Sequence, residues 1–181
     1  MVAHAAIPEG IAFRDAAASD AHAVAALHAD SWRRFYRGAY SDEFLDGDVL
    51  ADRQFVWSAR LSQPSMATRT LLATTSDEGL IGFVHVVLDE DLTWGSLVDN
   101  IHVGRLNQHR GIGSQLIARA AAVVAETAVA SGLYLWVLEQ NTSAQAFYQR
   151  HGATCAEKTT VQPPNGVHTR LNGSPMKLRY V

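Results

Sequence analysis

The 181-residue sequence has a single cysteine, Cys155, so it cannot form an internal disulfide. Chains without disulfides are typical of the reducing cytoplasm, and we therefore expect a cytoplasmic protein. The sequence has no apolar run near the roughly 20 residues that a membrane-spanning helix needs. Its first ten residues, MVAHAAIPEG, lack the basic segment and long apolar stretch of a secretory signal. We expect no membrane partner and interpret residues 1–10 as a loose lead-in.

The sequence also lacks an excess of basic residues. It has 15 Lys and Arg against 18 Asp and Glu, which gives a net charge of −3. Nucleic-acid-binding domains usually carry a pronounced basic surface, so no nucleic-acid partner is expected. The eight histidines show no HxxxH spacing, and a CxxC pair is absent. Because metal ligands on one element commonly have such spacings, we expect no metal.

What the chain does have is enough apolar sequence for one core. Apolar residues make up 48% of the 181 residues, sufficient for a core that needs neither disulfides nor a metal. No internal repeat and no low-complexity linker divides the chain. We expect a single domain over residues 1–181.

The first third of the chain is predicted to be helical. Apolar residues at helical spacing indicate a helix that begins near Ser19 or Asp20 and ends near Gly38. Two shorter helices are expected over residues 41–47 and Val49–Leu61, the second ending before a proline.

The middle of the chain changes to the pattern of strands. Three β-rich runs predict consecutive hairpin strands at Thr68–Thr75, Leu80–Leu88 and Ser96–Val103. The acidic triplet at residues 89–91 is interpreted as the solvated turn between the last two strands.

The last third returns to alternating helices and strands. A long helical pattern, SQLIARAAAVVAETAVA, ends near Gly132, and the apolar run Leu133–Leu138 predicts a strand buried on both faces. A capping box over residues 142–145 starts another helix. Two final strands are expected near Ala153–Val161 and Ser174–Tyr180. The chain as a whole predicts a mixed α/β fold.

Two glycines stand at the start of the long helix, in the run QHRGIG (residues 108–113). Ser, Thr, Asp or Asn would cap a helix better, so glycine indicates another requirement. A helix N-terminus attracts anions, and glycine lets its backbone approach a bulky diphosphate. The amides of residues 110–114 are therefore predicted to bind an anion, the alternative being that the glycines serve only a tight turn. The GxxxxGK[ST] and GxGxxG phosphate loops are both absent.

This region resembles the GNAT superfamily of acyl-CoA-dependent N-acyltransferases. Gln108, Gly111 and Gly113 match the family signature Q/R-x-x-G-x-G/A. DNIHV resembles the fourth strand of the family, WVLEQNTSAQAFYQRHGA its second signature, and IAFRDAAASDAHAVAALHADSW its first strand and helix. The likeness covers most of the chain. It implies a GNAT-like domain with a twisted, mostly antiparallel central sheet of about six or seven strands, flanked by helices, in which the fourth and fifth strands splay apart.

The resemblance implies acetyl-CoA as the co-substrate. Pantetheine is then expected in the opening between the splayed strands, the diphosphate on the loop that precedes the long helix, and an asparagine side chain on the pantetheine arm. The residues assigned to acetyl-CoA in this way are Ile101, His102, Val103, Gln108, His109, Arg110, Gly111, Ile112, Gly113, Ser114, Asn141 and Tyr148.

Tyr148 matches the tyrosine that often protonates the departing thiolate in this family. A phenol suits this role because its pKa of about 10 lies near that of a thiol. The alternative is a core tyrosine, since Tyr148 continues the helical stripe of Ala144 and Phe147.

The general base stays open between two residues. Some family members carry a glutamate in the fifth strand, where this chain has Trp136. Asp99 and His102 remain as candidates, acting directly or through water, and a histidine has a pKa suited to neutral pH. Strand alternation predicts that Asp99 and Ile101 share one face while Asn100 and His102 share the other.

The acceptor is expected near Trp32 and Tyr36, which lie one helical turn apart. Their ring faces can attract a cationic amine, the alternative being that they pack in the core. The resemblance implies a small-molecule or peptide amine and allows a homodimer.

The sequence thus predicts an N-acetyltransferase in which a primary amine directly attacks acetyl-CoA in a ternary complex. A catalytically silent acyl-CoA-binding sensor stays open because the fifth-strand glutamate is missing. A third interpretation is another anion-binding α/β protein, such as a nucleotide binder.

Overall fold

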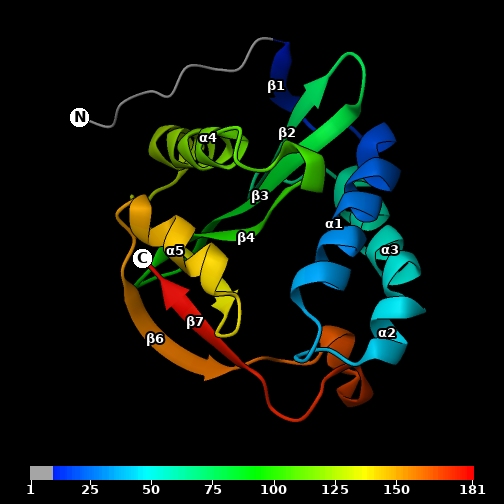
Figure 1. Cartoon of the computed structure of the whole chain (residues 1–181). Helices are drawn as coiled ribbons and strands as arrows, with labels where there is room; N and C mark the ends of the chain where they lie inside the picture. Colours follow the sequence, from blue (N-terminus) through cyan, green and yellow to red (C-terminus); the bar gives the residue numbers. More distant parts are fainter. Residues whose placement is uncertain (1–9) are drawn as a thin grey trace.

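The computed structural model describes residues 10–181 (Figure 1), so the lead-in expected over residues 1–10 lies almost wholly outside the described range. Seven strands form one sheet in the order β1-β2-β3-β4-β5-β7-β6. Their bounds are β1 Ile11–Asp15, β2 Thr68–Thr75, β3 Gly79–Asp91, β4 Gly95–Val103, β5 Leu133–Leu138, β6 Cys155–Thr160 and β7 Met176–Tyr180. The α-helices are α1 Ala21–Phe35, α2 Asp42–Asp46, α3 Val49–Ser62, α4 Ile112–Thr127 and α5 Thr142–Arg150.

All neighbouring strands in the sheet run antiparallel except β4 and β5, which run parallel. The last strand of the chain, β7, inserts between β5 and β6. The mixed α/β class and the mostly antiparallel sheet predicted above are therefore confirmed.

The helices cover the sheet in two layers (Figure 1). Helices α1 and α3 pack on one face, where the buried residues include Val24, Trp57 and Phe83. Helices α4 and α5 pack on the other face, around Leu116 and Tyr148. The apolar stripes predicted for these helices are the surfaces that they bury. In the described part of the chain, no helix combines the length and apolarity that crossing a membrane requires.

The acidic triplet was wrongly placed in a turn, because β3 continues through Asp91. The Asp89 carboxylate accepts hydrogen bonds from the amides of Val129 (3.0 Å) and Ala130 (2.9 Å), which follow α4. These bonds lower the pKa of Asp89. The residue therefore ties the end of β3 to the end of α4, and the turn itself lies at residues 92–94.

Candidate active site

A β-bulge in β4 marks the centre of the candidate site. His85 of β3 pairs with Asn100, and the next residue, Val86, pairs with Val98, so Asp99 is a surplus residue in β4. Beside the bulge, the parallel pairing of β4 with β5 stops at Val98 and Leu135. Because the two strands share no ladder beyond this point, they diverge, as the resemblance implied.

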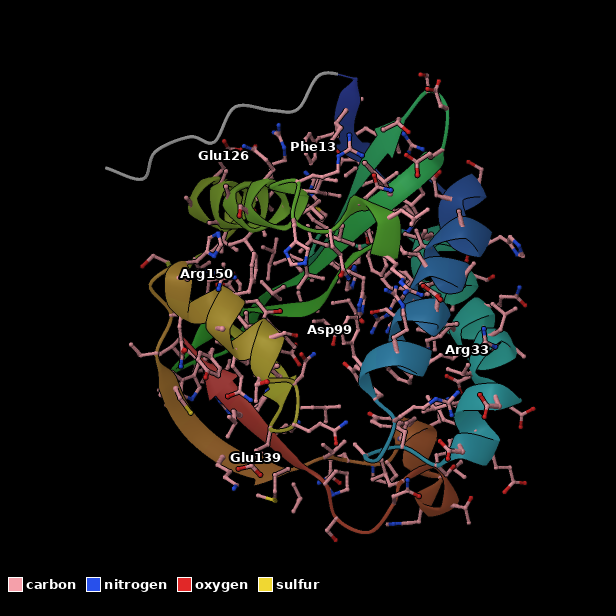
Figure 2. The ribbon with its side chains drawn as sticks, viewed as in Figure 1. Phe13, Arg33, Asp99, Glu126, Glu139 and Arg150 are labelled. Carbon is pink, nitrogen blue, oxygen red and sulfur yellow. The ribbon has the colours of Figure 1, made fainter. Side chains whose placement is uncertain are left out.

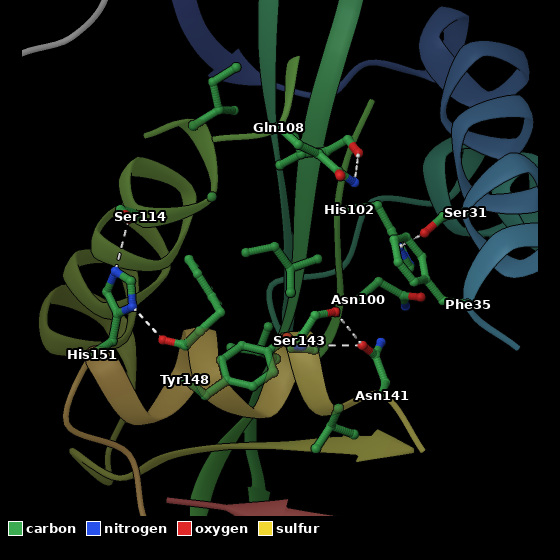
Figure 3. Close-up of a pocket in the computed structure, with 18 of the residues that line it drawn as sticks. Ser31, Phe35, Asn100, His102, Gln108, Ser114, Asn141, Ser143, Tyr148 and His151 are labelled. Atoms are coloured by element: carbon green, nitrogen blue, oxygen red, sulfur yellow. Dashed lines mark hydrogen bonds between the residues drawn. The ribbon is translucent and has the colours of Figure 1, made fainter. Parts of the chain in front are cut away.

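The divergence opens into a cavity of about 480 Å³ (Figure 3). Its walls come from α1, β4, β5, α5 and the loop that leads into α4. The residues assigned to acetyl-CoA from the sequence line this cavity, with the exception of Arg110. Residues 101–103, 108–114 and 141–148, which are far apart in the chain, are thus brought together.

The loop before α4 is shaped by left-handed backbone conformations. His109 has φ 61° and Gly111 has φ 78°. Gly111 is the residue before the helix, and no side chain from residues 10–181 caps the first amides of α4. The amide of Gln115 donates to the Gly111 carbonyl at 3.0 Å. The amides of Ile112, Gly113 and Ser114 precede that bond, so they have no acceptor within the helix. The helix therefore offers three donors and its positive dipole end to the cavity.

The two positions in the loop require glycine for different structural reasons. Gly111 needs its glycine for the positive φ, and a Cβ there would meet nothing within 4 Å. A Cβ on Gly113 would lie 3.3 Å from the Phe147 ring of α5. Gly113 therefore permits the close approach of α4 to α5, which the sequence pattern did not indicate.

Side chains of the loop hold it in place. The Arg110 guanidinium donates to the Asn107 side chain at 2.5 Å, and Asn107 donates to Glu78 at 3.0 Å. Gln108 donates to the carbonyl of Val103 at 3.4 Å. The side chain of Arg110 thus supports the loop from outside the cavity. Only the backbone amide of Arg110 could then take part in the predicted binding of acetyl-CoA.

Sequence reasoning gave no role to His151, which joins the two helices at the cavity. Its Nδ1 lies 2.8 Å from the carbonyl of Phe147, and its Nε2 lies 2.9 Å from the hydroxyl of Ser114 (Figure 3). His151 follows Phe147 at helical spacing, but no spacing in the sequence indicates its contact with Ser114 in α4.

Tyr148 is 9% exposed and belongs to the core, yet it also lines the cavity. Its hydroxyl makes no hydrogen bond within residues 10–181, and burial raises its pKa, with a smaller contribution from Tyr36. The phenol therefore keeps its proton at neutral pH. Both sequence interpretations of this residue, core side chain and proton donor, are compatible with the same position.

Asn141 caps α5 in place of the predicted capping box. Its Oδ1 accepts from the amide of Ala144 (3.1 Å) and from the hydroxyl of Ser143 (2.9 Å). The helix therefore begins at Thr142 with Asn141 as its N-cap. Its amide nitrogen has no hydrogen-bond partner among the described residues, and Asn141 lines the cavity (Figure 3).

The bulge overturns the predicted alternation of β4. Asp99 forms an ion pair with Arg60 of α3 at 2.8 Å, and it lies between the α1 and α5 sides of the molecule (Figure 2). His102 contacts Ser31 of α1, whereas Ile101 packs against the core of the α4 and α5 layer. Asp99 thus shares the face of His102 and not that of Ile101, because one surplus residue shifts the side-chain pattern.

The imidazole of His102 is held neutral. Its Nδ1 lies 2.8 Å from the hydroxyl of Ser31, and its ring lies 4.6 Å from that of His28. Burial lowers the pKa of His102 to about 3, although Asp99 opposes the change. This corrects the expectation of a pKa suited to neutral pH. Such a group is a poor acceptor for the proton of an ammonium, whose pKa is about 10.

The two aromatic residues predicted for the acceptor have different positions. Tyr36 lines the cavity, and its ring stacks on Trp32 at 5.0 Å between centroids. Trp32 is 8% exposed and packs in a core cluster with Phe44, outside the cavity lining. Phe35 and Trp136, which sequence reasoning did not assign to the acceptor, line the cavity as well.

Phe35, Tyr36 and Trp136 form an aromatic wall of the cavity. Asp52 of α3, outside the cavity lining, accepts hydrogen bonds from three residues. Its buried carboxylate accepts from Arg53 (2.9 Å) and, across more than 100 residues of sequence, from Asn165 (2.7 Å) and Arg170 (2.6 Å). The guanidinium of Arg53 lies 4.3 Å above the Trp32 ring. Asp52 therefore fixes the segment between β6 and β7 against α3 and supports the stack that ends in Tyr36.

Residues 24–153 match the family model described as "Acetyltransferase (GNAT) family". The chain belongs to the GNAT acetyltransferase family. The motif comparison made from the sequence is thereby confirmed.

Individual relatives agree with this family. The chain is 24% identical over 144 residues to YuaI of Bacillus subtilis, an uncharacterized N-acetyltransferase. The aligned region covers 78% of this chain and 79% of the relative. The PaiA N-acetyltransferase of Thermoplasma acidophilum, solved in complex with coenzyme A, superposes with a TM-score of 0.70 at 18% identity and covers 93% of this chain and 97% of that one. The acetyl-CoA complex of Arabidopsis thaliana NAA60 has a TM-score of 0.62 at 21% identity, with coverage of 94% and 96%.

Within residues 10–181, no cluster of three or more His, Cys, Asp and Glu side chains is arranged to hold a metal ion.

Proposed function

We propose that this protein is an acetyl-CoA-dependent N-acetyltransferase that acts on a primary amine of a small molecule or peptide. The observation that carries the proposal is the continuity of one cavity. It joins three amides at the start of α4 to the opening between β4 and β5 and then to the aromatic wall of α1.

The described residues fit acetyl-CoA in chemistry as well as in shape. The amides of residues 112–114 and the dipole of α4 suit the diphosphate. Beyond Val98, β4 still pairs with β3 but no longer with β5, so the edge that faces β5 offers backbone groups to the pantetheine arm. The Asn141 amide nitrogen is a further donor. These groups are fixed by the fold before any ligand arrives, so little ordering is required on binding.

In the proposed reaction, the amine nitrogen forms a bond to the acetyl carbon while the carbon–sulfur bond of the thioester breaks. Tyr148 donates its proton to the departing sulfur, which the unpartnered hydroxyl in the cavity allows. The amine must also lose a proton. We assign this proton to Asp99, directly or through water, because its carboxylate lines the cavity and attracts an ammonium, whereas the Nδ1 of the buried His102 already contacts Ser31.

The decisive experiment measures thiol release from acetyl-CoA over a panel of primary amines, together with calorimetric binding of CoA. We expect turnover with at least one amine. We expect Tyr148→Phe to lower kcat by about 10²-fold, the lower range for loss of a general acid, while the dissociation constant for CoA stays unchanged. Tyr134→Phe is the matched control, because Tyr134 is a buried tyrosine outside the cavity lining.

The alternatives predict different results. A silent acyl-CoA sensor would bind CoA without turnover of any amine. A nucleotide binder would prefer ATP over CoA in the same calorimetric experiment, and that preference would contradict the proposal.

A further inference from the structure

One face of the β5–β7 pair looks toward α1 and α2. Trp136 pairs in register with Arg179, and Leu138 pairs with Lys177. Residues directly opposite in an antiparallel pair share a face, so these four side chains lie together. Leu138 packs in the cluster formed with α1 and α2, which identifies the face as the acceptor side of the sheet.

The two cations on this face differ in how their charge is balanced. The Arg179 guanidinium lies 4.5 Å from the ring centroid of Trp136 and 3.1 Å from the Glu157 carboxylate, with Asp91 at 3.6 Å. Its charge is therefore compensated by aromatic faces and two carboxylates. The ammonium group of Lys177 has no hydrogen bond and no ion pair with any residue from 10 to 181.

The nearby carboxylates are already bound elsewhere. Asp99 and Glu157 both favour the charged form of Lys177, but Asp99 pairs with Arg60 and Glu157 pairs with Arg179. Burial and the charge of Arg179 lower the pKa of Lys177. A partly buried ammonium without an anionic partner is unfavourable, and an anion beside it would relieve that cost.

The place of Lys177 connects it to the cavity. Its Nζ lies 4.3 Å from the ring centroid of Trp136, and Trp136 lines the cavity on β5, where β4 has diverged. Asp99 lines the same cavity from β4. The Lys177 side chain itself lies outside the cavity lining, so an acceptor that begins beside Asp99 reaches the ammonium past the Trp136 ring.

We propose that Lys177 binds a carboxylate of the acceptor, so that the substrate class is a primary amine that also carries a carboxylate. The amine end lies toward Asp99 and the opening between β4 and β5, and the carboxylate end lies beside Trp136 on Lys177. This inference rests on the proposed acetyl transfer, because it names the acceptor of that same site.

The test compares matched acceptors in the full-length protein with acetyl-CoA. ω-Amino acids of increasing length are measured against the alkylamines of the same length, and α-amino acids against their amides. We expect kcat/KM to favour the carboxylate-bearing member by tenfold or more, mainly through KM. Lys177→Met keeps an unbranched stem over Trp136 but removes the charge, and it should abolish that preference. Lys177→Arg should retain it.

The remaining outcomes distinguish failure of the Lys177 inference from failure of the proposed function. Turnover of amines without preference for a carboxylate overturns the role of Lys177 and leaves acetyl transfer intact. An equal loss for both members of a pair in Lys177→Met means that the side chain is only structural. Absence of all turnover overturns the proposed function. In that case, calorimetry with CoA present still decides the carboxylate site, because N-acetylated amino acids must bind more tightly than their amides and only with Lys177 in place.

Discussion

At the end of the cavity beside α4, the groups offered to a ligand are backbone amides, whereas at the end beside α1 they are side chains. The α4 end is formed by a short stretch at residues 108–114, together with Asn141 and residues of α5 that include Tyr148. The α1 end combines aromatic rings and a carboxylate from α1, β4 and β5, and α3 and the segment before β7 support it through Asp52.

This difference separates the part of the site proposed for the co-substrate from the part that selects the acceptor. In the proposed function, backbone amides bind the diphosphate that every CoA thioester shares, and most side-chain substitutions leave these amides in place. Side chains set which acceptor fits, and they depend on distant parts of the chain being held in register. The two ends should therefore respond differently to mutation, and three experiments test that difference.

The largest effect is expected for Asp52→Ala. The substitution leaves the buried Arg53 and the partly buried Arg170 without their carboxylate, which costs about 3–5 kcal/mol of stability. Because Asp52 supports the wall that ends in Tyr36, KM for the acceptor should rise, while CoA affinity should change little. Urea unfolding and calorimetry measure the two quantities. Asp48→Ala, an exposed carboxylate one residue before α3, is the control. Equal losses of CoA and acceptor binding would show that the two ends are not independent.

The next effect concerns pH and the buried histidines of the α1–α3 side. Burial lowers the pKa of His28 well below 6.5, that of His85 to about 4 and that of His102 to about 3. Below pH 6.5 the unfolded chain therefore binds more protons than the folded one, so stability falls as the pH falls. From pH 7 to 6 the expected loss is about 2 kcal/mol for the three together. Urea midpoints at the two pH values measure it.

A variant sharpens this pH experiment. His85→Gln removes one buried imidazole, so the pH-dependent loss should shrink by about one third. A loss that is the same in the variant and the parent would mean that His85 titrates alike in both states.

The smallest effect is expected for Gly111→Ala. The site has room for a Cβ, but φ 78° costs about 1 kcal/mol for any residue other than glycine. The loop then adopts the binding conformation less often, so the dissociation constant for CoA should rise by up to about tenfold. Gly152→Ala has the same kind of strain at φ 90°, with open space and outside the cavity lining, and should leave CoA affinity unchanged. Parallel changes in both variants would contradict the special role of the loop.

The sequence predicted the α4 end well because its chemistry is local. Glycine positions, helix starts and strand runs follow from neighbouring residues, so the start of α4 and the bounds of β5 were predicted correctly. The end of α4 was not, because the helix stops at Thr127 and not near Gly132. The fold class was accessible for the same reason. The face of Asp99 was assigned by assuming a regular strand, although alternation breaks where Leu97 and Val98 are followed by Asp99 and Asn100. This is why Asp99 was assigned to the wrong face.

The α1 end was predicted only in part because its contacts are long-range. Nothing near Asp52 in the sequence indicates Arg170 or Asn165, and nothing near Lys177 indicates Trp136. The insertion of β7 between β5 and β6 creates the second contact, and strand order depends on the whole sheet. Trp32 illustrates the same limit: helical spacing put it beside Tyr36 but did not reveal that core residues would enclose it.

The surplus residue in β4 also determines how tolerant this strand is to changes in length. If Asp99 were deleted, Asn100 would still stand opposite His85 and Val98 opposite Val86, so the ladder with β3 would become regular and the later side chains of β4 would keep their layers. A deletion within residues 100–103 would instead move the following side chains to the other layer. We therefore expect that homologues differing in the length of this strand differ at the bulge itself.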